Sequence, residues 1–509
     1  MMEAFNLADQ FVDRHLREGR GEKIAIRCGD RAVTYAQVAE DTTRVGNGLR
    51  ALGIQPPERV LIALPDGPEF AAAYFGAMKI GAVAVPTNPS LKPADYAYLL
   101  DESEAAALIV QADVHAQIEP VLADRRFLRH VIVCGPDWDE WLAAQSADLT
   151  AALTRAIDPA FWLWTSGSTG MPKAAVHLHR DWICCCENYA GGVLGITTDD
   201  VTFSSSKLFH AYGLGNGLMF PFHAGATTVL YPGRPQAAAI LKAAQEFRPT
   251  LFFSVPTLYA AMLEDGGSYD LGSVRLAVSA AEPLPAEMFR RWKQRFGVEI
   301  LDGIGSTEAL HIYLSARAGK VRPGSTGEPV PGYEIRIVDA EGADVPRGSI
   351  GDLLVRGEST ARLYWNRPDL SKQRMRDGWF YSGDKYWIDE DGYFWYAGRS
   401  DDMVRVSGQW VSPIEVESAL VEHAAVLEAA VIGHTEPCGL GTVKAFVVLR
   451  QGFAGTDELI RDLQAFVRQR IAPYKYPRRV EFLAELPKNA TGKLLRYKLR
   501  ELDCGQAGL

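Results

Sequence analysis

The chain has 509 residues, of which 47% are hydrophobic and 23% charged. This length predicts more than one domain, and the composition is typical of a soluble globular protein. The net charge of −10 argues against binding to bulk nucleic acid. The first residues lack the basic start and apolar core of a signal peptide, and no apolar run is long enough to cross a bilayer. We therefore expect a cytoplasmic protein with no membrane partner.

Strand and helix patterns alternate along the first half of the chain. Buried strands are predicted at 60–64 and 82–86, and a helix is predicted between them at 70–79. Further strands are predicted at 227–231 and 250–255. Such alternation is typical of doubly wound α/β layers.

The loop from Thr165 to Lys173 follows the apolar segment 161–164, which is predicted to be a buried strand. Hydroxyls and backbone N–H groups of such a loop can face phosphate oxygens, and the lysine adds a compact positive charge. The loop is not a Walker A motif, because Met171 and Pro172 precede the lysine. The alternative is a flexible surface turn. The residues expected to contact phosphates are Thr165, Ser166, Gly167, Ser168, Thr169, Gly170 and Lys173.

The run Cys184-Cys185-Cys186 follows this loop. Successive side chains on a helix point in different directions, so the three thiols are poorly placed to bind one metal ion. The total of seven cysteines is odd for a disulfide framework. We expect these three to be small buried residues in a reducing compartment.

After Gly324 the pattern becomes richer in strands and turns. A half-buried strand is predicted at 334–338, and turns at 377–378 and 391–392. The polar cluster at 398–402 marks the expected domain boundary, which divides the chain into 1–400 and 401–509. The second part is expected to be a small α+β domain with strands at 429–433 and 444–449.

Four more polar segments follow apolar ones, at 302–308, 381–384, 398–402 and 487–493. Together with the loop at 165–173 they resemble, in order, the motifs of the adenylate-forming superfamily. That superfamily includes acyl-CoA synthetases, luciferases and peptide-synthetase adenylation domains. The resemblance covers almost the whole chain. It implies an α/β fold with a large N-terminal domain, made of two α/β subdomains and a small β-rich subdomain, and a smaller mobile α+β C-terminal domain.

The resemblance also implies a reaction in two halves. A carboxylate attacks the α-phosphate of Mg·ATP, which yields an acyl-adenylate and pyrophosphate. A thiol, usually that of coenzyme A, then displaces AMP. Both halves concentrate negative charge on oxygens, so fixed donors and cations should lower the barriers. The implied cofactors and substrates are ATP, Mg²⁺ and coenzyme A.

Individual roles follow from the same resemblance. Thr307 is expected to meet the α-phosphate, Glu308 to hold Mg²⁺ through a hard oxygen, and Lys493 to bridge the carboxylate and α-phosphate during adenylation. Asp384 is expected to accept hydrogen bonds from two ribose hydroxyls, and Arg399 is expected to donate a hydrogen bond to the same ribose. The loop at 165–173 is expected to hold the β- and γ-phosphates. The residues expected to border adenine are Ala281, Glu282, Pro283, Asp302 and Gly303.

Each of these residues also has a simpler explanation. Glu308 could be a charge at a helix N-terminus, and Asp384 a turn residue. Arg399 could form a surface ion pair with Asp401, and Lys493 could be solvated. The joint occurrence of all the motifs favours the functional interpretation.

The catalytic lysine and the phosphate loop lie on different predicted domains. In the resembled family the small domain rotates about a hinge at the residue that matches Asp401. One orientation brings in Lys493, and the other presents residues 406–410, with Gly408, to the thiol channel.

The basic and aromatic cluster at 474–479 favours coenzyme A as the thiol. In related ligases a segment at this position meets the nucleotide end of coenzyme A. Tyr474, Lys475 and Arg478 suit that role, because cations bind its phosphates and a tyrosine can stack on adenine. The alternative is a solvated basic face.

The acid is expected to be small and aromatic. Family positions for the acyl pocket carry flat or small residues, so a planar ring fits and a second carboxylate would lack a partner. The segments 211–216 and 305–312 resemble the benzoate-CoA and hydroxybenzoate-CoA ligase group. The residues expected to line the pocket are His210, Ala211, Tyr212, Ser279, Ile304, Gly305 and His311.

His210 departs from the phenylalanine that is frequent in benzoate ligases. A histidine here could hydrogen-bond a hydroxyl or amino group on the ring, which brings hydroxybenzoate and aminobenzoate into consideration. The alternative is that it gates the pocket as an aromatic ring, the usual role of this position in the family.

Other classes of function make different predictions. A kinase or NTPase would release ADP, a luciferase-like enzyme would need oxygen chemistry, and a non-catalytic regulator would not need both Glu308 and Lys493. Family analogy places the reaction in the breakdown of aromatic compounds by a monomer or homodimer. Acetylation of Lys493 would remove the charge it needs.

Overall fold

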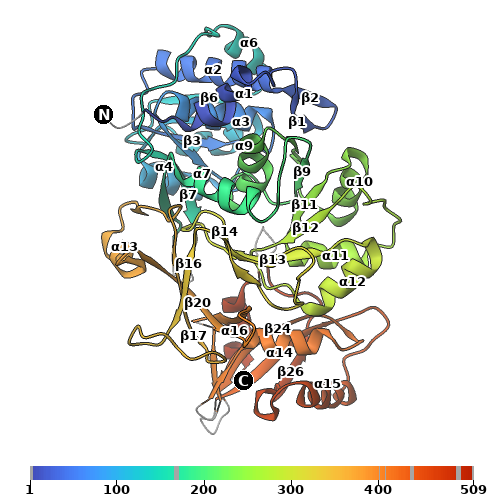
Figure 1. The fold of residues 1–509 in the computed structure, drawn as a ribbon. Helices are drawn as coiled ribbons and strands as arrows, with labels where there is room; N and C mark the ends of the chain where they lie inside the picture. The colour runs from blue at the N-terminus through green and yellow to red at the C-terminus, as the bar shows by residue number, and fades with distance from the viewer. Residues whose placement is uncertain are drawn as a thin grey trace.

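The computed structural model describes residues 4–165, 171–400, 402–406, 409–435, 441–488 and 494–506. These residues form two large sheets with helices around them, a smaller antiparallel sheet, and a further three-stranded sheet near the carboxyl terminus (Figure 1). The predicted α/β class, with a large first domain and a smaller second one, is confirmed. In this described part of the chain, no helix is long and apolar enough to cross a bilayer.

The first large sheet has the order β18-β8-β7-β4-β3-β5-β6 and is parallel from β7 to β6. Val60 and Ile62 face the core that includes α3, whereas Leu61 and Ala63 face the core that includes α4. Both faces of the strand are therefore buried, which explains its continuous apolar run. The predicted helix and strands in this region are confirmed. The strands are β3 (Arg59–Ala63), β4 (Val83–Pro86), β5 (Ala105–Gln111), β6 (His130–Cys134), β7 (Pro159–Thr165), β8 (Lys173–Leu178) and β18 (Leu363–Tyr364).

The helices of this first part follow its strands. α2 begins at an N-cap, where the Thr34 hydroxyl accepts a hydrogen bond from the Gln37 backbone N–H. The cysteine run lies on α7 and η3 and is largely buried, as predicted. The helices are η1 (Asp9–Asp13), α1 (Arg14–Arg17), α2 (Tyr35–Ala51), α3 (Pro68–Lys79), α4 (Pro93–Ser103), α5 (Ala112–Ile118), η2 (Glu119–Val121), α6 (Trp138–Ala143), α7 (Asp181–Cys185) and η3 (Cys186–Gly191).

The second large sheet has the order β15-β14-β13-β12-β11-β9-β10-β1-β2. Its central strands are parallel, and the predicted strands at 227–231 and 250–255 appear as β10 and β11. The strands are β1 (Ile24–Cys28), β2 (Arg31–Thr34), β9 (Val201–Ser204), β10 (Thr227–Val229), β11 (Leu251–Ser254), β12 (Leu276–Ser279), β13 (Ile300–Gly305), β14 (Ile312–Ser315) and β15 (Glu328–Pro329). The helices are α8 (Ala211–Leu214), η4 (Gly215–Met219), α9 (Phe220–Ala224), α10 (Ala237–Phe247), α11 (Pro256–Glu264) and α12 (Ala286–Phe296).

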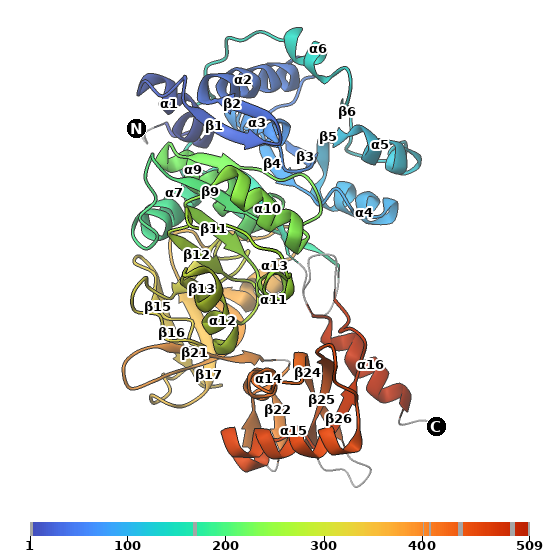
Figure 2. The same ribbon diagram turned by 90° about the vertical axis from the view of Figure 1, so that its right-hand side faces the viewer.

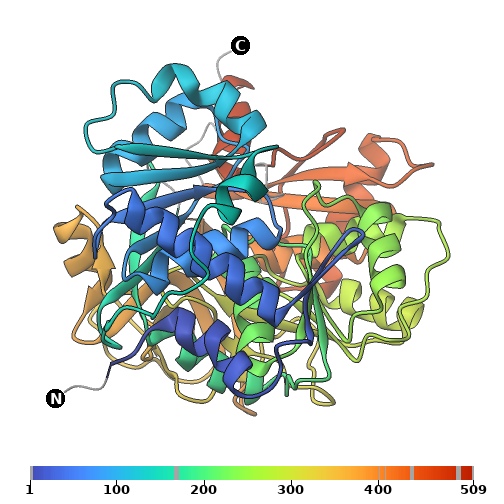
Figure 3. The same cartoon turned by 90° about the horizontal axis from the view of Figure 1, so that it is seen from above.

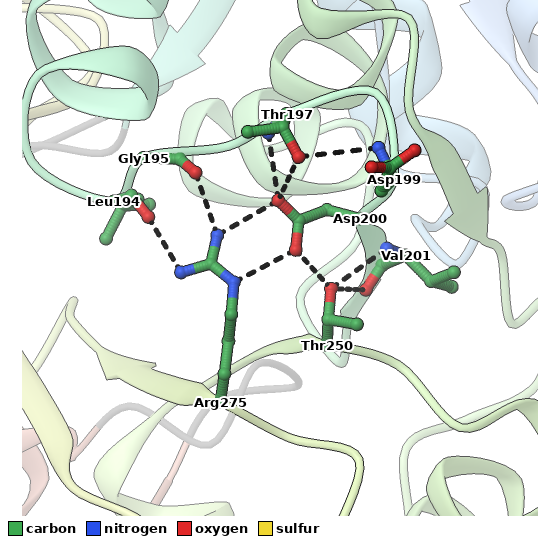
Figure 4. Close-up of polar contacts among 8 residues, drawn as sticks. All are labelled: Leu194, Gly195, Thr197, Asp199, Asp200, Val201, Thr250 and Arg275. Carbon is green, nitrogen blue, oxygen red and sulfur yellow. Dashed lines mark hydrogen bonds and ion pairs between the residues drawn. The ribbon is translucent and has the colours of Figure 1, made fainter.

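An ion pair between a buried aspartate and a partly exposed arginine joins two strands of the second sheet near their starts (Figure 4). Asp200, just before β9, accepts bonds from the Arg275 guanidinium at 2.9 and 3.0 Å. The hydroxyl of Thr250 donates to the same carboxylate at 2.6 Å, and Arg275 also donates to the carbonyls of Leu194 and Gly195. The network fixes the loop before β9 against the start of β12.

The antiparallel sheet follows, with the order β16-β17-β20-β19 and β21 paired to β20. The predicted strand at 334–338 is β16, and the predicted turns place Asp377, Gly378 and Gly392 at positive φ. The elements are β16 (Glu334–Val338), β17 (Gly351–Arg356), α13 (Pro368–Arg374), β19 (Met375–Arg376), β20 (Trp379–Ile388) and β21 (Phe394–Arg399).

The carboxyl-terminal elements form a hairpin and a sheet of order β24-β25-β26. They lie beside α11 and α12 (Figures 2 and 3), where Arg450 forms an ion pair of 2.6 Å with Glu264. The predicted strands at 429–433 and 444–449 lie within β24 and β25. The elements are β22 (Val404–Val406), β23 (Gln409–Val411), α14 (Pro413–Val421), β24 (Val426–Thr435), β25 (Gly441–Leu449), α15 (Asp457–Arg470), η5 (Pro473–Lys475), β26 (Arg479–Phe482) and α16 (Arg496–Gln506).

Candidate active site

The phosphate loop is bracketed by two antiparallel neighbours. β7 ends at Thr165 and β8 begins at Lys173, and these two residues are register partners. The backbone pairing therefore brings the two ends of the loop together. Both residues are half-buried. The other predicted phosphate ligands, Ser166, Gly167, Ser168, Thr169 and Gly170, lie outside the described residues.

Lys173, Tyr364 and Glu308 form a compact polar cluster. The Lys173 Nζ lies 4.4 Å from the centroid of the Tyr364 ring, and the Tyr364 hydroxyl donates to Glu308 Oε1 at 2.6 Å. Burial lowers the pKa of Lys173, although Glu308 opposes this effect. Sequence reasoning missed Tyr364, because it reaches the site only through the pairing of β18 with β8.

Glu308 lies in the turn between β13 and β14 and not on a helix, so the helix N-terminus explanation is wrong. Glu308 is buried, with only 8% of its surface exposed. The preceding residue, Thr307, is half-buried, and its carbonyl accepts a hydrogen bond from His177 Nε2 at 2.8 Å. The carbonyl of Glu308 accepts the Ala361 N–H at 2.6 Å. The turn is thus fixed from two sides.

Asp384 and Arg399 are register partners on β20 and β21, and their side chains form an ion pair of 3.0 Å. Burial alone would lower the pKa of Arg399, but Asp384 raises it above its usual value. Asp384 lies within a strand, so its explanation as a simple turn residue is wrong. The neighbouring Gly383 has a φ of +78°, which favours glycine.

The Lys173–Glu308 cluster and the Asp384–Arg399 pair lie close enough for their charges to interact. The charges of Arg374 and Arg399 lower the pKa of Lys173, while Asp384 and Glu308 both raise the pKa of the buried Tyr313. Arg374, at the end of α13, was also missed from sequence. Three cations around two carboxylates form a site with the charges that a polyphosphate and one divalent cation require.

The predicted adenine-bordering residues lie at the ends of β12 and β13. Ala281 is exposed and has a φ of +74°. The half-buried Glu282 carboxylate accepts the Thr257 hydroxyl at 2.7 Å, and the half-buried Pro283 follows it. Burial raises the pKa of Asp302 well above its usual value, and the Gly303 N–H opposes this.

Asp302 is directly beside Ser279, because the two are register partners on β13 and β12. A Cβ on Gly303 would lie 3.0 Å from Ile312, so the strand is tightly packed here. The Asp302 Oδ1 and Ser279 Oγ atoms are buried and make no hydrogen bond to any described residue. They mark polar atoms that a ligand can satisfy.

The N-terminus of α8 carries three of the predicted acyl-pocket residues. His210 is half-buried at the N-cap, and burial lowers its pKa to about 4. Ala211 is buried, and the Tyr212 hydroxyl lies 3.2 and 3.1 Å from the carbonyls of Ser254 and Val278. The aromatic ring of Tyr212 is therefore fixed in place.

A residue missed from sequence anchors this segment. The buried carboxylate of Asp66 accepts the Leu208 N–H at 3.0 Å and forms an ion pair of 3.4 Å with Lys207. Asp66 lies between β3 and α3, far from the segment in sequence. No local pattern predicts this contact.

His311 occupies the middle of a group of rings. Its ring lies 4.5 Å from Phe220, 5.5 Å from Tyr189 and 5.6 Å from Tyr212 between centroids. The residue is 2% exposed, and burial lowers its pKa to about 3, with a smaller opposing effect of the Tyr212 backbone. Neither ring nitrogen makes a hydrogen bond of normal length and angle to a described residue.

Small residues make room for that ring. A Cβ on Gly215 would lie 2.5 Å from the His311 ring, and a Cβ on Gly305 would lie 2.5 Å from the His311 carbonyl. Ile304 and Gly305 are half-buried beside it at the end of β13. The predicted acyl residues therefore come from three separate segments, on α8, β12 and the β13–β14 region.

The carboxyl-terminal candidates are only partly described. Lys475 forms an ion pair of 2.6 Å with Glu415 on α14, so the solvated-face explanation is wrong for this lysine. The exposed Arg478 lies 4.6 Å from the Tyr476 ring, and Tyr474 is half-buried. Asp401, Gly408 and Lys493 lie outside the described residues, which leaves their predicted roles untested.

Residues on either side of these positions are ordered by their own contacts. Lys488 and Leu494 form an antiparallel bridge. Asp402 forms ion pairs with Arg496, at 3.6 Å, and with Arg500, both on α16. Among the described residues no group of three His, Cys, Asp or Glu could hold a metal ion. A single carboxylate at Glu308 fits Mg²⁺ that arrives with phosphate ligands.

Comparisons with known proteins place these features in a family. Residues 12–365 match the model of the AMP-binding enzyme family, and residues 415–493 match that of its C-terminal domain. The chain is 47% identical to a benzoate–CoA ligase of Thauera aromatica, over 98% of this chain and 96% of that protein. It is 42% identical to a 4-hydroxybenzoate–CoA/benzoate–CoA ligase of Rhodopseudomonas palustris, over 98% and 95%.

Two solved structures also resemble this chain over nearly their whole length. The crystal structure of an anthranilate CoA ligase in complex with anthranoyl-AMP superimposes with a TM-score of 0.95 at 41% identity, and covers 100% of this chain and 99% of that one. A benzoate CoA ligase from Burkholderia xenovorans superimposes with a TM-score of 0.91 at 44% identity, over 97% and 100%.

Proposed function

Because the chain belongs to the AMP-binding enzyme family, we propose that it is an ATP-dependent ligase that joins an aromatic carboxylic acid to coenzyme A. The acid is first activated as an acyl-adenylate with release of pyrophosphate, and the acyl group then passes to the thiol with release of AMP. The observation that carries this proposal is the polar cluster of Lys173, Tyr364 and Glu308 together with the Asp384–Arg399 pair, and the group of rings around His311, which follows Glu308 by three residues in the chain.

In the first half-reaction the cations of the site act on the phosphates. Lys173 and Arg374 are proposed to oppose the charge of the β- and γ-phosphates, and Glu308 is the residue that would hold Mg²⁺. The bound ion would neutralise charge on the phosphate oxygens. The Tyr364 hydroxyl orients the Glu308 carboxylate by donating to one of its oxygens. Thr307 is proposed to contact the α-phosphate.

The nucleoside is proposed to bind beside β20 and β21. The ion pair with Arg399 directs the Asp384 carboxylate, so it can accept hydrogen bonds from ribose hydroxyls. The adenine ring is proposed to lie against the segment Ala281–Pro283 and the Asp302–Gly303 strand end. The buried oxygen of Asp302 that lacks a described partner supports this placement.

The acid is proposed to be benzoate or a hydroxybenzoate. The rings of Tyr212, Phe220 and His311 lie together here, and two similar proteins are named as ligases of benzoate or hydroxybenzoate. An aminobenzoate is the second candidate. It is supported by the structural similarity to an anthranilate ligase and by the nitrogens of His210 and His311 that make no normal hydrogen bond to described residues.

The carboxyl-terminal roles are proposed from the sequence resemblance. Lys493 is proposed to join the site for adenylation, and Gly408 to line the thiol channel after rotation about Asp401, at the boundary between 1–400 and 401–509. Coenzyme A is proposed to meet Tyr474, Lys475 and Arg478. The protein is proposed to act in the cytoplasm as a monomer or homodimer, in the breakdown of aromatic compounds.

The test is formation of AMP and thioester with Mg·ATP and coenzyme A across a panel of acids. The panel holds benzoate, the three hydroxybenzoates, aminobenzoates, cinnamate, acetate and a medium-chain fatty acid. AMP and thioester with the benzoates alone are expected. A preference for aliphatic acids would contradict the aromatic pocket, and release of ADP would indicate a kinase or NTPase instead.

A further inference from the structure

A buried histidine and aspartate lie directly behind the Thr307–Glu308 turn. His177 is the second-last residue of β8, and Asp181, four residues later, is the first residue of α7. The His177 Nδ1 atom lies 3.0 Å from Asp181 Oδ2, and its Nε2 atom lies 2.8 Å from the carbonyl oxygen of Thr307. Both side chains are 0% exposed. The nucleotide site does not need them for any direct contact.

The direction of these hydrogen bonds follows from their partners. Asp181 Oδ2 already accepts the Leu178 backbone N–H at 2.9 Å, so it is an acceptor toward His177 as well. The Thr307 carbonyl is also an acceptor. His177 Nε2 therefore donates to the Thr307 carbonyl, and Nδ1 lies against the Asp181 carboxylate. The ring stacks on Phe161 with centroids 5.2 Å apart, which fixes its plane.

We propose that His177, held by Asp181, is a positioning residue for the first half-reaction. It holds the Thr307 carbonyl and so keeps the Thr307 and Glu308 side chains directed at the α-phosphate and Mg²⁺. The inference rests on the proposed function of that turn. It adds a residue that touches neither nucleotide nor acid and acts through the backbone of one that does.

The burial of His177 and Asp181 indicates that they orient the Thr307–Glu308 turn and do not serve mainly to stabilise the fold. A buried ion pair is costly to desolvate, and an apolar pair of similar volume is often as stable or more so. His177 and Asp181 nevertheless lie in a packed core, and their one hydrogen bond to the proposed catalytic turn is the bond from His177 to the Thr307 carbonyl. Because Asp181 and Phe161 hold the ring, the Nε2–H donor restricts the position of the Thr307 carbonyl.

Two substitutions separate the contacts of the ring. In His177→Gln the amide nitrogen replaces Nε2, so donation to Thr307 is kept and the Asp181 contact is lost. In His177→Asn the amide nitrogen replaces Nδ1, so the Asp181 contact is kept and the Thr307 contact is lost. His179→Asn is the control, because the nearby buried His179 accepts the Leu7 N–H at 3.1 Å.

The measurements are AMP formation with Mg·ATP and the preferred benzoate over a range of Mg²⁺ concentrations, and thioester formation from supplied acyl-adenylate without Mg²⁺. His177→Asn is expected to lower AMP formation by about ten-fold or more and to raise the Mg²⁺ concentration for half-maximal rate, since the buried hydrogen bond to the Thr307 carbonyl is lost. Thioester formation should fall much less. His177→Gln should recover most of the first rate, and His179→Asn should not change the Mg²⁺ requirement.

Three outcomes would overturn the inference: an unchanged Mg²⁺ requirement in His177→Asn, equal impairment of the Gln and Asn variants, or equal loss of both half-reactions. If His177→Asn does not fold, Asp181→Asn replaces it. Because this substitution weakens the contact that holds His177 Nδ1, the same change in Mg²⁺ requirement is expected, and its absence overturns the inference. Absence of AMP from the unmodified enzyme with every acid would instead contradict the proposed function.

Discussion

The Tyr364 hydroxyl donates a hydrogen bond of 2.6 Å to Glu308 Oε1, and the face of the same ring lies 4.4 Å from the Lys173 Nζ. One side chain thus separates the base of the phosphate loop from the carboxylate proposed to hold Mg²⁺. The contact joins β18 to the β13–β14 turn, which are 56 residues apart in the chain. It suggests that the ring sets the distance between a cation and an anion that must both meet ATP.

Tyr364→Phe is expected to weaken the binding of Mg²⁺ during AMP formation. The ring and its packing remain, while the buried carboxylate loses one donor, a hydrogen bond to a charged group that contributes about 1.5–3 kcal/mol. The Mg²⁺ concentration for half-maximal rate should rise, and the melting temperature should change little. Thioester formation from supplied acyl-adenylate is the control. An unchanged Mg²⁺ titration would contradict the orienting role.

Gly215→Ala is expected to raise the KM for benzoate. The added Cβ would lie 2.5 Å from the His311 ring and 3.2 Å from Trp182, so the histidine must move into the acid pocket. The matched control is Gly266→Ala, where a Cβ meets nothing within 4 Å. Steady-state kinetics with benzoate and the hydroxybenzoates measure the effect. Equal kinetics in both variants would show that His311 does not border the acid.

His210→Phe is expected to shift preference from hydroxybenzoate toward benzoate. The pKa of His210 is lowered to about 4 by burial, so the ring is neutral at pH 7 and presents one donor and one acceptor nitrogen. Phenylalanine keeps the ring shape and removes both. The measurement is the ratio of kcat/KM values for the two acids. If that ratio stays constant, the residue serves only as an aromatic gate.

Lys493→Ala is expected to abolish acyl-adenylate formation and to leave transfer from supplied acyl-adenylate to coenzyme A. The ammonium is proposed to stabilise charge only in the adenylating orientation, so the two half-reactions should separate. Pyrophosphate exchange measures the first, and thioester formation measures the second. Equal loss of both would contradict the assignment, and loss of neither would identify a different catalytic cation.

Arg275→Ala is expected to lower the free energy of unfolding by about 1–2 kcal/mol, because it removes two hydrogen bonds to the buried Asp200 carboxylate, while the 38% exposure of the arginine side chain screens the ion pair. Burial alone would raise the Asp200 pKa, but the bonds from Arg275, Thr250 and Thr197 lower it below its usual value. This carboxylate therefore adds stability above its unfolded pKa of about 3.9, and that stability is lost as the pH falls through its folded pKa.

Denaturant unfolding at pH 7 and at pH 3 measures both parts of this prediction. The difference between the parent protein and Arg275→Ala should be largest at pH 7 and should shrink in acid. Arg248→Ala is the matched control, since its ion pair with Asp270 is exposed on both sides. A difference that does not depend on pH would show that the arginine acts through packing alone.

The amino-acid sequence was sufficient for features that depend on neighbouring residues. Runs such as 60–64 and 250–255 are apolar because their strands are buried on both faces, so their structure follows from local pattern. The loop from Thr165 to Lys173 is recognisable because its glycines and hydroxyls occur together in one segment. Motifs in a family order likewise predicted the domain types and the reaction class.

Only the tertiary structure showed which side chains meet across the chain. Tyr364 reaches Glu308, His177 reaches Thr307, and Asp66 reaches the Leu208 N–H because sheet order and loop packing bring those segments together. None of these contacts leaves a local periodic signal, since each partner lies on a different element. The strength of a buried hydrogen bond depends on distance and exclusion of water, and those are set by the packed fold and not by any one segment.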